Sequence, residues 1–409
     1  MKTNFIRLLA GILFFQLSQF ARADVLDNWI TNQINTNAAG LKHVVYGNGL
    51  FVAAGEKGDG GEIYTSTNGS NWILRYSDNN AWGLTMNYSG GHFSGVGGWE
   101  TAVSADGTNW TVSFLPFVSG SFGYGNLTDV TFGNNPIFGT SLYVAVGDTN
   151  GVGYIITSPD GITWLPRKPS TTPGGHISSV VYDGNKFVAV GADGFEYNST
   201  SGTGTWTKRA FPGAGLISYA NGLFISPLNN KTNVISVDGF NWSLQATGLT
   251  NQLGKVTFGN NLFLAECGVS ASTMYFATSV DGTNWFQYPQ PLPNHWGGHV
   301  GGGKYDVSLA SDGISLIGVG TEDPAAFYSN SLIYNSGVVV GTRMTNNPPR
   351  SVVLSGLVGR NYQIQFTDAF GAGSNWRTNL ALQLTNTPYV WTDATATNSA
   401  RFYRGVLLP

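Results

Sequence analysis

The chain is poor in charged residues, in cysteine and in long apolar runs. Charged residues make up 11% of its 409 residues, against about a quarter in average soluble chains. The net charge of −3, from 20 basic and 23 acidic residues, offers no field for holding a phosphate backbone, which excludes a nucleic-acid partner. Cys267 is the single cysteine, so neither an intrachain disulfide nor a cysteine-based metal site can form, and we expect it to be a buried strand residue.

The sequence also lacks the composition of a disordered chain and the apolar runs of a membrane protein. Aromatic residues make up 13% of the chain, which is ample apolar surface to bury on folding. Residues 1–23 combine a basic start, an apolar stretch from Leu8 to Phe15 and small residues before position 24. This predicts a signal peptide cleaved near Ala23, and hence a protein that is secreted or held at the cell surface, extracellular or periplasmic. No later stretch reaches the roughly 20 apolar residues of a membrane-spanning helix, so we expect no stable membrane insertion.

A repeat of about 40 residues, within the range typical of repeat architectures, organises most of the chain. Its clearest copies are a β-branched run, a turn rich in Gly and Asn, and a second apolar run ending in Gly. They cover residues 42–55, 179–191 and 255–268, with looser copies starting at Asp129, Ile217 and Tyr305 and a degenerate one at Leu84. Together they predict seven units.

A second element, Ser-x-Asp-Gly-x-Asn/Thr-Trp or a close variant, follows in most units. It occupies residues 66–72, 104–110, 158–164, 236–242 and 279–285, and an altered copy leads to Trp206. Asp-Gly and Gly-Asn suit tight turns, because Gly accepts positive φ and Asp can bond the backbone two residues on. Each unit therefore predicts four antiparallel strands, and helical periodicity is missing throughout.

Four-stranded units cannot bury both faces alone, so they must stack on one another. Arranged radially, seven of them form a β-propeller, with six or eight blades as alternatives. The seventh unit has no Trp of its own, whereas Trp29 precedes Trp72 at the repeat spacing. We therefore expect the start of the mature chain to supply the outer strand of the last blade, in a propeller over residues 24–337.

The Ser-x-Asp-Gly-x-Asn/Thr-Trp element resembles the Asp-box of BNR-like, sialidase-type propellers, although it is one residue shorter. In that family the motif is structural and lies away from the active site, so the resemblance implies the fold only. We expect its aspartates to cap turns.

The repeat ends near Gly337, and the prolines within residues 338–350 predict a linker. Residues 351–409 alternate like strands and predict a small β-sandwich. This segment is similar to the fibronectin type III-like or immunoglobulin-like modules of exported proteins from Verrucomicrobia-type bacteria, which implies an accessory role. Arg401 and Arg404 are expected on a solvated strand face.

Loop length varies only on the propeller face opposite the Gly-Asn and Asp-Gly turns, and loops that vary on a rigid scaffold commonly carry binding groups. Aromatic rings beside polar groups suit sugars. The candidate ligand-binding residues are Glu56, Trp82, Tyr124, Asp148, His176, Asp193, His295, Trp296, His299 and Glu322. The alternative is that these aromatics merely close the central channel.

No motif for catalysis, metal binding or cofactor binding fits the strand and loop positions expected for its residues. Arg75, Arg167 and Arg209 each follow a Trp by three residues, which puts them on outer strands, too far apart for the arginine cluster of a sialidase. The two imidazoles of 295–299 lie in a Gly-rich loop without the helix that would aim both at one zinc ion. Asp148-Thr-Asn-Gly151 lacks the later carboxylate of a calcium loop. We expect no catalytic residues, metal or cofactor.

The sequence favours an exported, monomeric, non-catalytic module that binds an extracellular glycan or a protein. Two alternatives stay open: a glycoside hydrolase or polysaccharide lyase with acids drawn from different blades, and a structural surface protein without a ligand.

Overall fold

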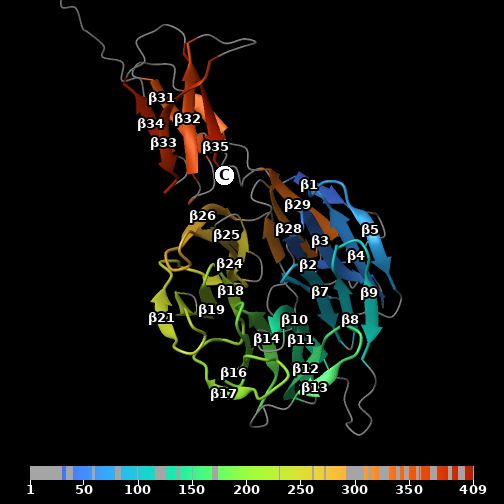
Figure 1. Cartoon of the computed structure of the whole chain (residues 1–409). Helices are drawn as coiled ribbons and strands as arrows, with labels where there is room; N and C mark the ends of the chain where they lie inside the picture. Colours follow the sequence, from blue (N-terminus) through green and yellow to red (C-terminus); the bar gives the residue numbers. More distant parts are fainter. Residues whose placement is uncertain are drawn as a thin grey trace, which may run out of the picture.

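The protein is described from a computed structural model, drawn in Figure 1. The described residues are 30–33, 40–57, 60–78, 84–98, 100–115, 126–135, 139–149, 151–167, 174–229, 231–259, 262–270, 273–291, 308–311, 315–321, 331–337, 341–344, 350–355, 359, 361–368, 375–385, 389–394 and 401–408. Within these ranges the regular structure is all β, with no helix. Over the same residues, no helix long and apolar enough to cross a membrane is found.

Five sheets each consist of four strands that pair antiparallel in chain order. The first sheet contains β2 (Gly40–Gly47), β3 (Leu50–Lys57), β4 (Gly60–Ser66) and β5 (Ile73–Ser77). The second contains β6 (Thr85–Ser89), β7 (His92–Gly97), β8 (Glu100–Ser104) and β9 (Thr111–Phe114). The third contains β10 (Asn126–Asn135), β11 (Thr140–Thr149), β12 (Val152–Ser158) and β13 (Leu165–Arg167). The fourth contains β14 (Ile177–Tyr182), β15 (Phe187–Gly191), β16 (Phe195–Ser199) and β17 (Thr207–Ala210). The fifth contains β18 (Ser218–Ala220), β19 (Leu223–Asn229), β20 (Thr232–Ser236) and β21 (Ser243–Ala246).

The following sheet has a divided first strand. Both β22 (Gln252–Leu253) and β23 (Thr257–Gly259) pair with β24 (Leu262–Ser270), which continues to β25 (Thr273–Ser279) and β26 (Phe286–Pro291). Between the two short strands, the Gly254 amide donates to the Glu266 carbonyl oxygen (2.9 Å). The interruption therefore keeps one backbone hydrogen bond across the gap.

The last repeated sheet takes one strand from the start of the chain. Its order is β1 (Ile30–Gln33), β29 (Ser331–Gly337), β28 (Ser315–Thr321) and β27 (Ser308–Ser311). Strand β1 runs antiparallel to β29, with Ile30 opposite Asn335 and Gln33 opposite Leu332. The prediction that an N-terminal segment forms the outer strand here is confirmed, while Trp29 itself lies outside the described residues.

These sheets stand around a common axis with their first strands innermost (Figure 1). Neighbouring sheets share apolar cores; Val52, Ala54 and Ile63 of one, for example, pack with Leu84 and Met86 of the next. The first and last sheets are joined in the same way, because Leu41 and Phe51 cluster with Ala310, Ile317 and Val319. The ring of sheets is therefore closed by packing as well as by β1.

The turns form as their residues predict. Asn48 and Gly49 between β2 and β3 have φ of 48° and 75°, and Asn221 and Gly222 between β18 and β19 have 49° and 77°. Positive φ at both central residues is the geometry of a type I′ hairpin turn, which Asn-Gly favours.

The aspartates of the second repeat element cap their turns, as predicted. Asp160 Oδ1 accepts from the Ile162 and Thr163 amides (2.9 and 2.7 Å), and Asp106, Asp238 and Asp281 do the same in their copies. These amide hydrogen bonds hold the pKa of Asp106, Asp160 and Asp238 below the usual range. In five copies the tryptophan Nε1 at the end of the element donates to the carbonyl oxygen of the turn glycine, and this includes the altered copy, where Trp206 bonds Gly202 (3.0 Å). In the remaining copy Trp242 Nε1 donates to the Glu196 carboxyl instead.

An aromatic residue lies in the last part of the innermost strand of six sheets and pairs with a ring on the next strand. The ring centroids of these pairs lie 4.6 to 4.8 Å apart: Tyr46–Phe51, Tyr88–Phe93, Phe132–Tyr143, Tyr182–Phe187, Tyr219–Phe224 and Phe258–Phe263. The Tyr182 ring also lies directly over Gly133 of the preceding sheet, as Tyr88 does over Gly47. Glycine is needed there because a Cβ would fall inside the ring's contact distance.

We expect Gly133→Ala to lower the free energy of unfolding by about 1 to 3 kcal/mol, because the added methyl must push the Tyr182 ring away from the neighbouring sheet. Gly174→Ala is the control, since its nearest neighbouring atom would lie 3.8 Å away, and its effect should stay within about 0.5 kcal/mol. Urea unfolding of both variants measures the difference. Equal stabilities would contradict the proposed packing.

Two three-stranded sheets form the C-terminal part. One has the order β30 (Gly341–Met344), β31 (Arg350–Ser355), β34 (Tyr389–Asp393), and the other β33 (Arg377–Gln383), β32 (Asn361–Thr367), β35 (Phe402–Leu407). Buried residues from both, among them Val352, Leu354, Tyr362 and Ile364, make one core. Because β30 pairs with β31, part of the predicted linker 338–350 belongs to a sheet.

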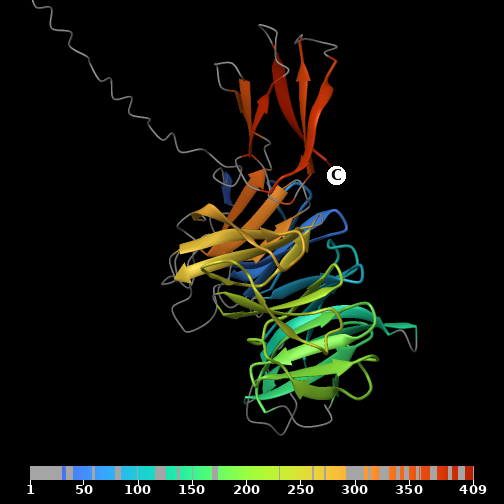
Figure 2. The same cartoon turned by 90° about the vertical axis from the view of Figure 1, so that its left-hand side faces the viewer.

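This part stands beside the ring of sheets, as Figure 2 shows, and contacts it through Gly359. With φ of 92°, Gly359 lies against Leu262 and Val280, leaving no room for a Cβ.

The expectation of a solvated Arg401 is wrong. The Arg401 side chain is 8% exposed and forms ion pairs with Asp368 and Asp393, both at 2.9 Å. Its guanidinium also lies over the Phe366 ring, 4.3 Å from the centroid. The two carboxylates come from other parts of the chain, so the alternating pattern around Arg401 gave no sign of them.

Candidate functional site

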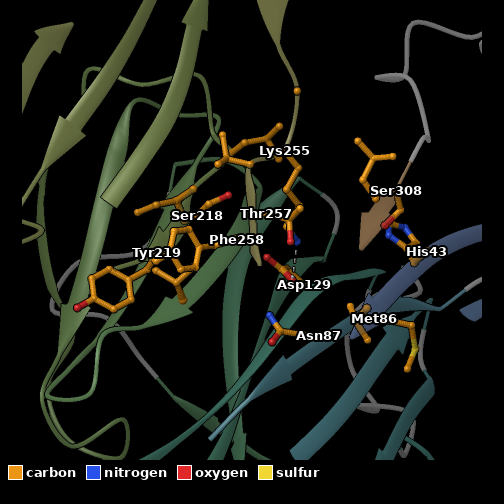
Figure 3. Close-up of a pocket in the computed structure, with 18 of the residues that line it drawn as sticks. His43, Met86, Asn87, Asp129, Ser218, Tyr219, Lys255, Thr257, Phe258 and Ser308 are labelled. Atoms are coloured by element: carbon orange, nitrogen blue, oxygen red, sulfur yellow. Dashed lines mark ion pairs between the residues drawn. The ribbon is translucent and has the colours of Figure 1, made fainter. Parts of the chain in front are cut away.

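A cavity of about 820 Å³ runs along the axis of the ring of sheets. Every innermost strand contributes to its wall, from His43 on β2 through Asp129 on β10 to Ser308 on β27. Figure 3 shows these side chains converging from different sheets. We call this cavity the axial channel. Its volume falls within the range of small-ligand sites.

One position of the repeat falls at the channel wall, and in five of the seven repeated sheets the residue at this position lines the channel. Counting three residues back from the inner aromatic of each of the six sheets gives His43, Thr85, Asp129, Ser179, Leu216 and Lys255, and Ser308 takes this place on β27. We call these seven residues the girdle. In β2, β10 and β14 a β-bulge immediately precedes the girdle residue, and bulges commonly redirect a side chain.

Most girdle residues tie one sheet to its neighbour. The Ser308 hydroxyl accepts from the Val44 amide (3.0 Å) and donates to the Val44 carbonyl oxygen (3.1 Å), joining the last sheet to the first. Ser179 donates to the Ile217 carbonyl oxygen (3.2 Å), and Thr85 Oγ1 lies 3.5 Å from His43 Nε2. These contacts are structural, because they satisfy backbone and side-chain polar groups inside the wall.

Asp129 has the most partners in the girdle. Its Oδ2 accepts from the Ser179 hydroxyl (2.8 Å) and the Val180 amide (3.1 Å), and its Oδ1 accepts from the Val130 amide (3.0 Å). Lys255 approaches from a different sheet, with its Nζ 3.7 Å from Asp129 Oδ1 (Figure 3). The carboxylate is held in the wall, as an acceptor for groups around it.

His43 is uncharged at neutral pH. Burial, together with the nearby ammonium groups of Lys255 and Lys42, lowers the pKa of its imidazole to about 3. Lys255 is therefore the exposed cation among the described lining residues, with 41% of its side chain accessible.

Three of the loop-face candidates are brought together between the β10–β13 and β14–β17 sheets. His176 Nδ1 lies 3.0 Å from Asp148 Oδ1. Asp193 Oδ2 accepts from the Gly174 amide (3.2 Å) and the Tyr197 hydroxyl (2.9 Å), and forms an ion pair with Lys208 (3.6 Å). The imidazole is thus oriented by a carboxylate, with a third of it exposed.

The other candidates are placed only in part. Glu56 lies on β3, and its side chain is outside the described residues, as are Trp82, Tyr124, His295, Trp296, His299 and Glu322. None of the ten candidates is among the described residues that line the axial channel. Sequence reasoning missed the channel residues because they share a position whose side chain varies from repeat to repeat. Aligning the repeats on their inner aromatic would have gathered them.

The three arginines of the repeat region lie on outer strands, as predicted, in β5, β13 and β17. Arg75 and Arg167 each donate through Nε to a threonine hydroxyl on the neighbouring strand (2.9 and 2.7 Å). They are therefore engaged at the rim, away from the axis.

A buried carboxyl with a raised pKa lies between two sheets rather than in the channel. Burial raises the pKa of Glu196; a hydrogen bond from Trp242 Nε1 (2.5 Å) and the positive Arg209 offset part of the rise, and the resulting pKa is about 7. Strongly shifted groups are candidates for acid–base chemistry. Glu196 is fully buried, so it has no access to a substrate and its role is in packing.

No family model matches the chain, and neither does any curated protein. Solved structures do resemble it, with low sequence identity. A chain of the mitotic checkpoint complex matches 79% of this chain and 98% of its own length, with 10% identity and a TM-score of 0.51. YCF48 from Cyanidioschyzon merolae matches 74% of this chain and 98% of its own, with 17% identity and a TM-score of 0.47. YCF48 bound to D1 peptide matches 75% and 94%, with 16% identity and a TM-score of 0.48. The similarity to the checkpoint-complex chain shows that the all-β fold of four-stranded antiparallel sheets is propeller-like.

The buried position of Glu196 predicts a pH dependence of stability. A carboxyl whose pKa is higher in the folded state stabilises the fold below its unfolded pKa, near 4.5, and that stabilisation is lost as the pH rises through 7. We expect the wild type to lose roughly 2 to 3 kcal/mol of unfolding free energy between pH 5 and 8 relative to Glu196→Gln, which stays neutral. Chemical unfolding of both proteins across this range tests it. Parallel pH profiles would contradict the assignment.

Proposed function

We propose that the protein is an exported, monomeric, seven-bladed β-propeller that binds an extracellular ligand without transforming it. The axial channel is the binding site, and the C-terminal sheets form a fibronectin- or immunoglobulin-like sandwich with an accessory role. The observation that carries the proposal is the channel itself, a cavity of about 820 Å³ with polar side chains from several sheets converging in it.

The state of Asp129, one of two described carboxylates that line the channel, supports binding rather than catalysis. A general acid or a nucleophile needs an oxygen free to meet the substrate. Both oxygens of Asp129 already accept hydrogen bonds within the wall, and the side chain is 4% exposed. The sialidase alternative is disfavoured by the outer-strand places of Arg75, Arg167 and Arg209.

The ligand classes are a glycan and a protein segment. Asn87, Ser218 and Thr257 give the channel amide and hydroxyl groups for bonding to hydroxyls. On the loop face, Asp148, His176 and Asp193 form a second polar patch.

The proposal is tested by incubating the purified chain with a glycan array and with soluble polysaccharides, while assaying the supernatant for released sugars. We expect retention without product. Turnover of any polysaccharide would establish the enzyme alternative, and the absence of both glycan and protein binding would favour a purely structural role.

A further inference from the structure

Lys255 departs from the pattern of the other polar girdle residues. Ser308, Ser179 and Asp129 each bond a backbone group of the next sheet. Lys255 extends across the channel to Asp129, from the divided β22–β26 sheet to the β10–β13 sheet (Figure 3). A long side chain is not needed for the clamp, because serine suffices elsewhere in the girdle.

The charges that a ligand meets in the channel are therefore unequal. The Lys255 side chain is 41% exposed, whereas that of Asp129 is 4% exposed and Glu266 is 6% exposed. The two carboxylate side chains are buried in the wall, whereas the Lys255 side chain lines the channel and is partly exposed. Among the described lining residues, the accessible charge is positive.

The ion pair leaves hydrogen-bonding capacity on Lys255. Its Nζ lies 3.7 Å from Asp129 Oδ1, beyond the 2.7 to 3.2 Å of a hydrogen bond. An ammonium has three donors, so an oxygen anion entering the channel can take short hydrogen bonds that Asp129 does not. Asp129 keeps the ammonium in place without satisfying it.

We propose that Lys255 binds the carboxylate of an acidic sugar residue, a uronate, within the axial channel. This inference rests on the proposed binding function and names its ligand class. Asn87, Ser218 and Thr257 lie around the same space (Figure 3), and their amide and hydroxyl groups match the hydroxyls of a sugar ring. An acidic peptide would share the carboxylate but would leave these groups without partners, which costs affinity when they are buried by the ligand.

The test is calorimetric titration of the full mature chain with oligomers of galacturonic, glucuronic, mannuronic and guluronic acid. The matched control ligand is the methyl ester of each oligomer, which keeps the sugar and removes the charge. We expect at least one acid to bind and its ester to bind about 10-fold or more weakly, because a hydrogen bond between charged groups is lost. The affinity of the acid, but not of the ester, should fall as salt is raised.

Variants assign the effect to the residue. Lys255→Gln should weaken acid binding about 10- to 100-fold, Lys255→Arg should restore most of it, and Lys231→Gln, which removes the same charge from an exposed turn, should bind like the wild type. Thermal unfolding confirms that each variant is folded.

Several results would overturn the inference. They are equal affinity for acid and ester, an unchanged affinity in Lys255→Gln, failure of every uronate oligomer to bind, or tighter binding of a tetraglutamate peptide than of any uronate. Binding of a neutral glycan that does not depend on Lys255 would remove the inference and leave the proposed function intact. If no glycan or protein binds, both fail.

Discussion

Closure of the ring of sheets is the constraint on which the rest of the structure depends. Each sheet has two apolar faces, and a sheet with an uncovered face would expose a large hydrophobic surface and an open edge. Packing each sheet between two others solves this for every sheet only if the first and last also meet. They do so through Leu41 and Phe51 against Ala310 and Ile317, and β1 completes the last sheet from the other end of the sequence. The chain therefore gains the closing contacts only when its distant segments have come together.

The channel follows from closure. Closure also explains why some girdle residues bond the neighbouring sheet while another is exposed in the channel. Radial packing brings one residue of every repeat to the axis, where most of them clamp neighbouring sheets. Ser308 and Ser179 need only a hydroxyl for this. A repeat whose girdle residue does not bond the backbone of the next sheet, such as the one with the divided β22 and β23, can place a different group in the lumen. Lys255 occupies that place, held by the charge of Asp129.

Much of the fold could be predicted from the sequence, because its signals are local. Asn48-Gly49 specifies a hairpin turn through backbone conformation alone, and the aspartate of each Ser-x-Asp-Gly turn caps amides two and three residues away. The closing strand could be predicted because the spacing of Trp29 and Trp72 exposes the missing element. The site could not, because Asp129, Lys255 and Ser308 meet only when distant repeats converge. The prediction of a solvated Arg401 was wrong for the same reason, because its partners Asp368 and Asp393 are brought to it by the tertiary fold.

Disulfide crosslinking between β1 and β29 tests closure most directly. Asn32 lies opposite Ile333 and Thr31 opposite Tyr334, and directly opposed residues of antiparallel strands have Cα atoms about 4.5 to 5.5 Å apart, within reach of a disulfide. Cys267, the native cysteine, is buried and does not compete. The account predicts that cysteines at 32 and 333, or at 31 and 334, form an intramolecular disulfide on mild oxidation. Cysteines at 32 and 316 should not, because Leu316 lies on β28, one strand further away. Equal crosslinking of all three pairs, or of none, would contradict a ring closed by β1.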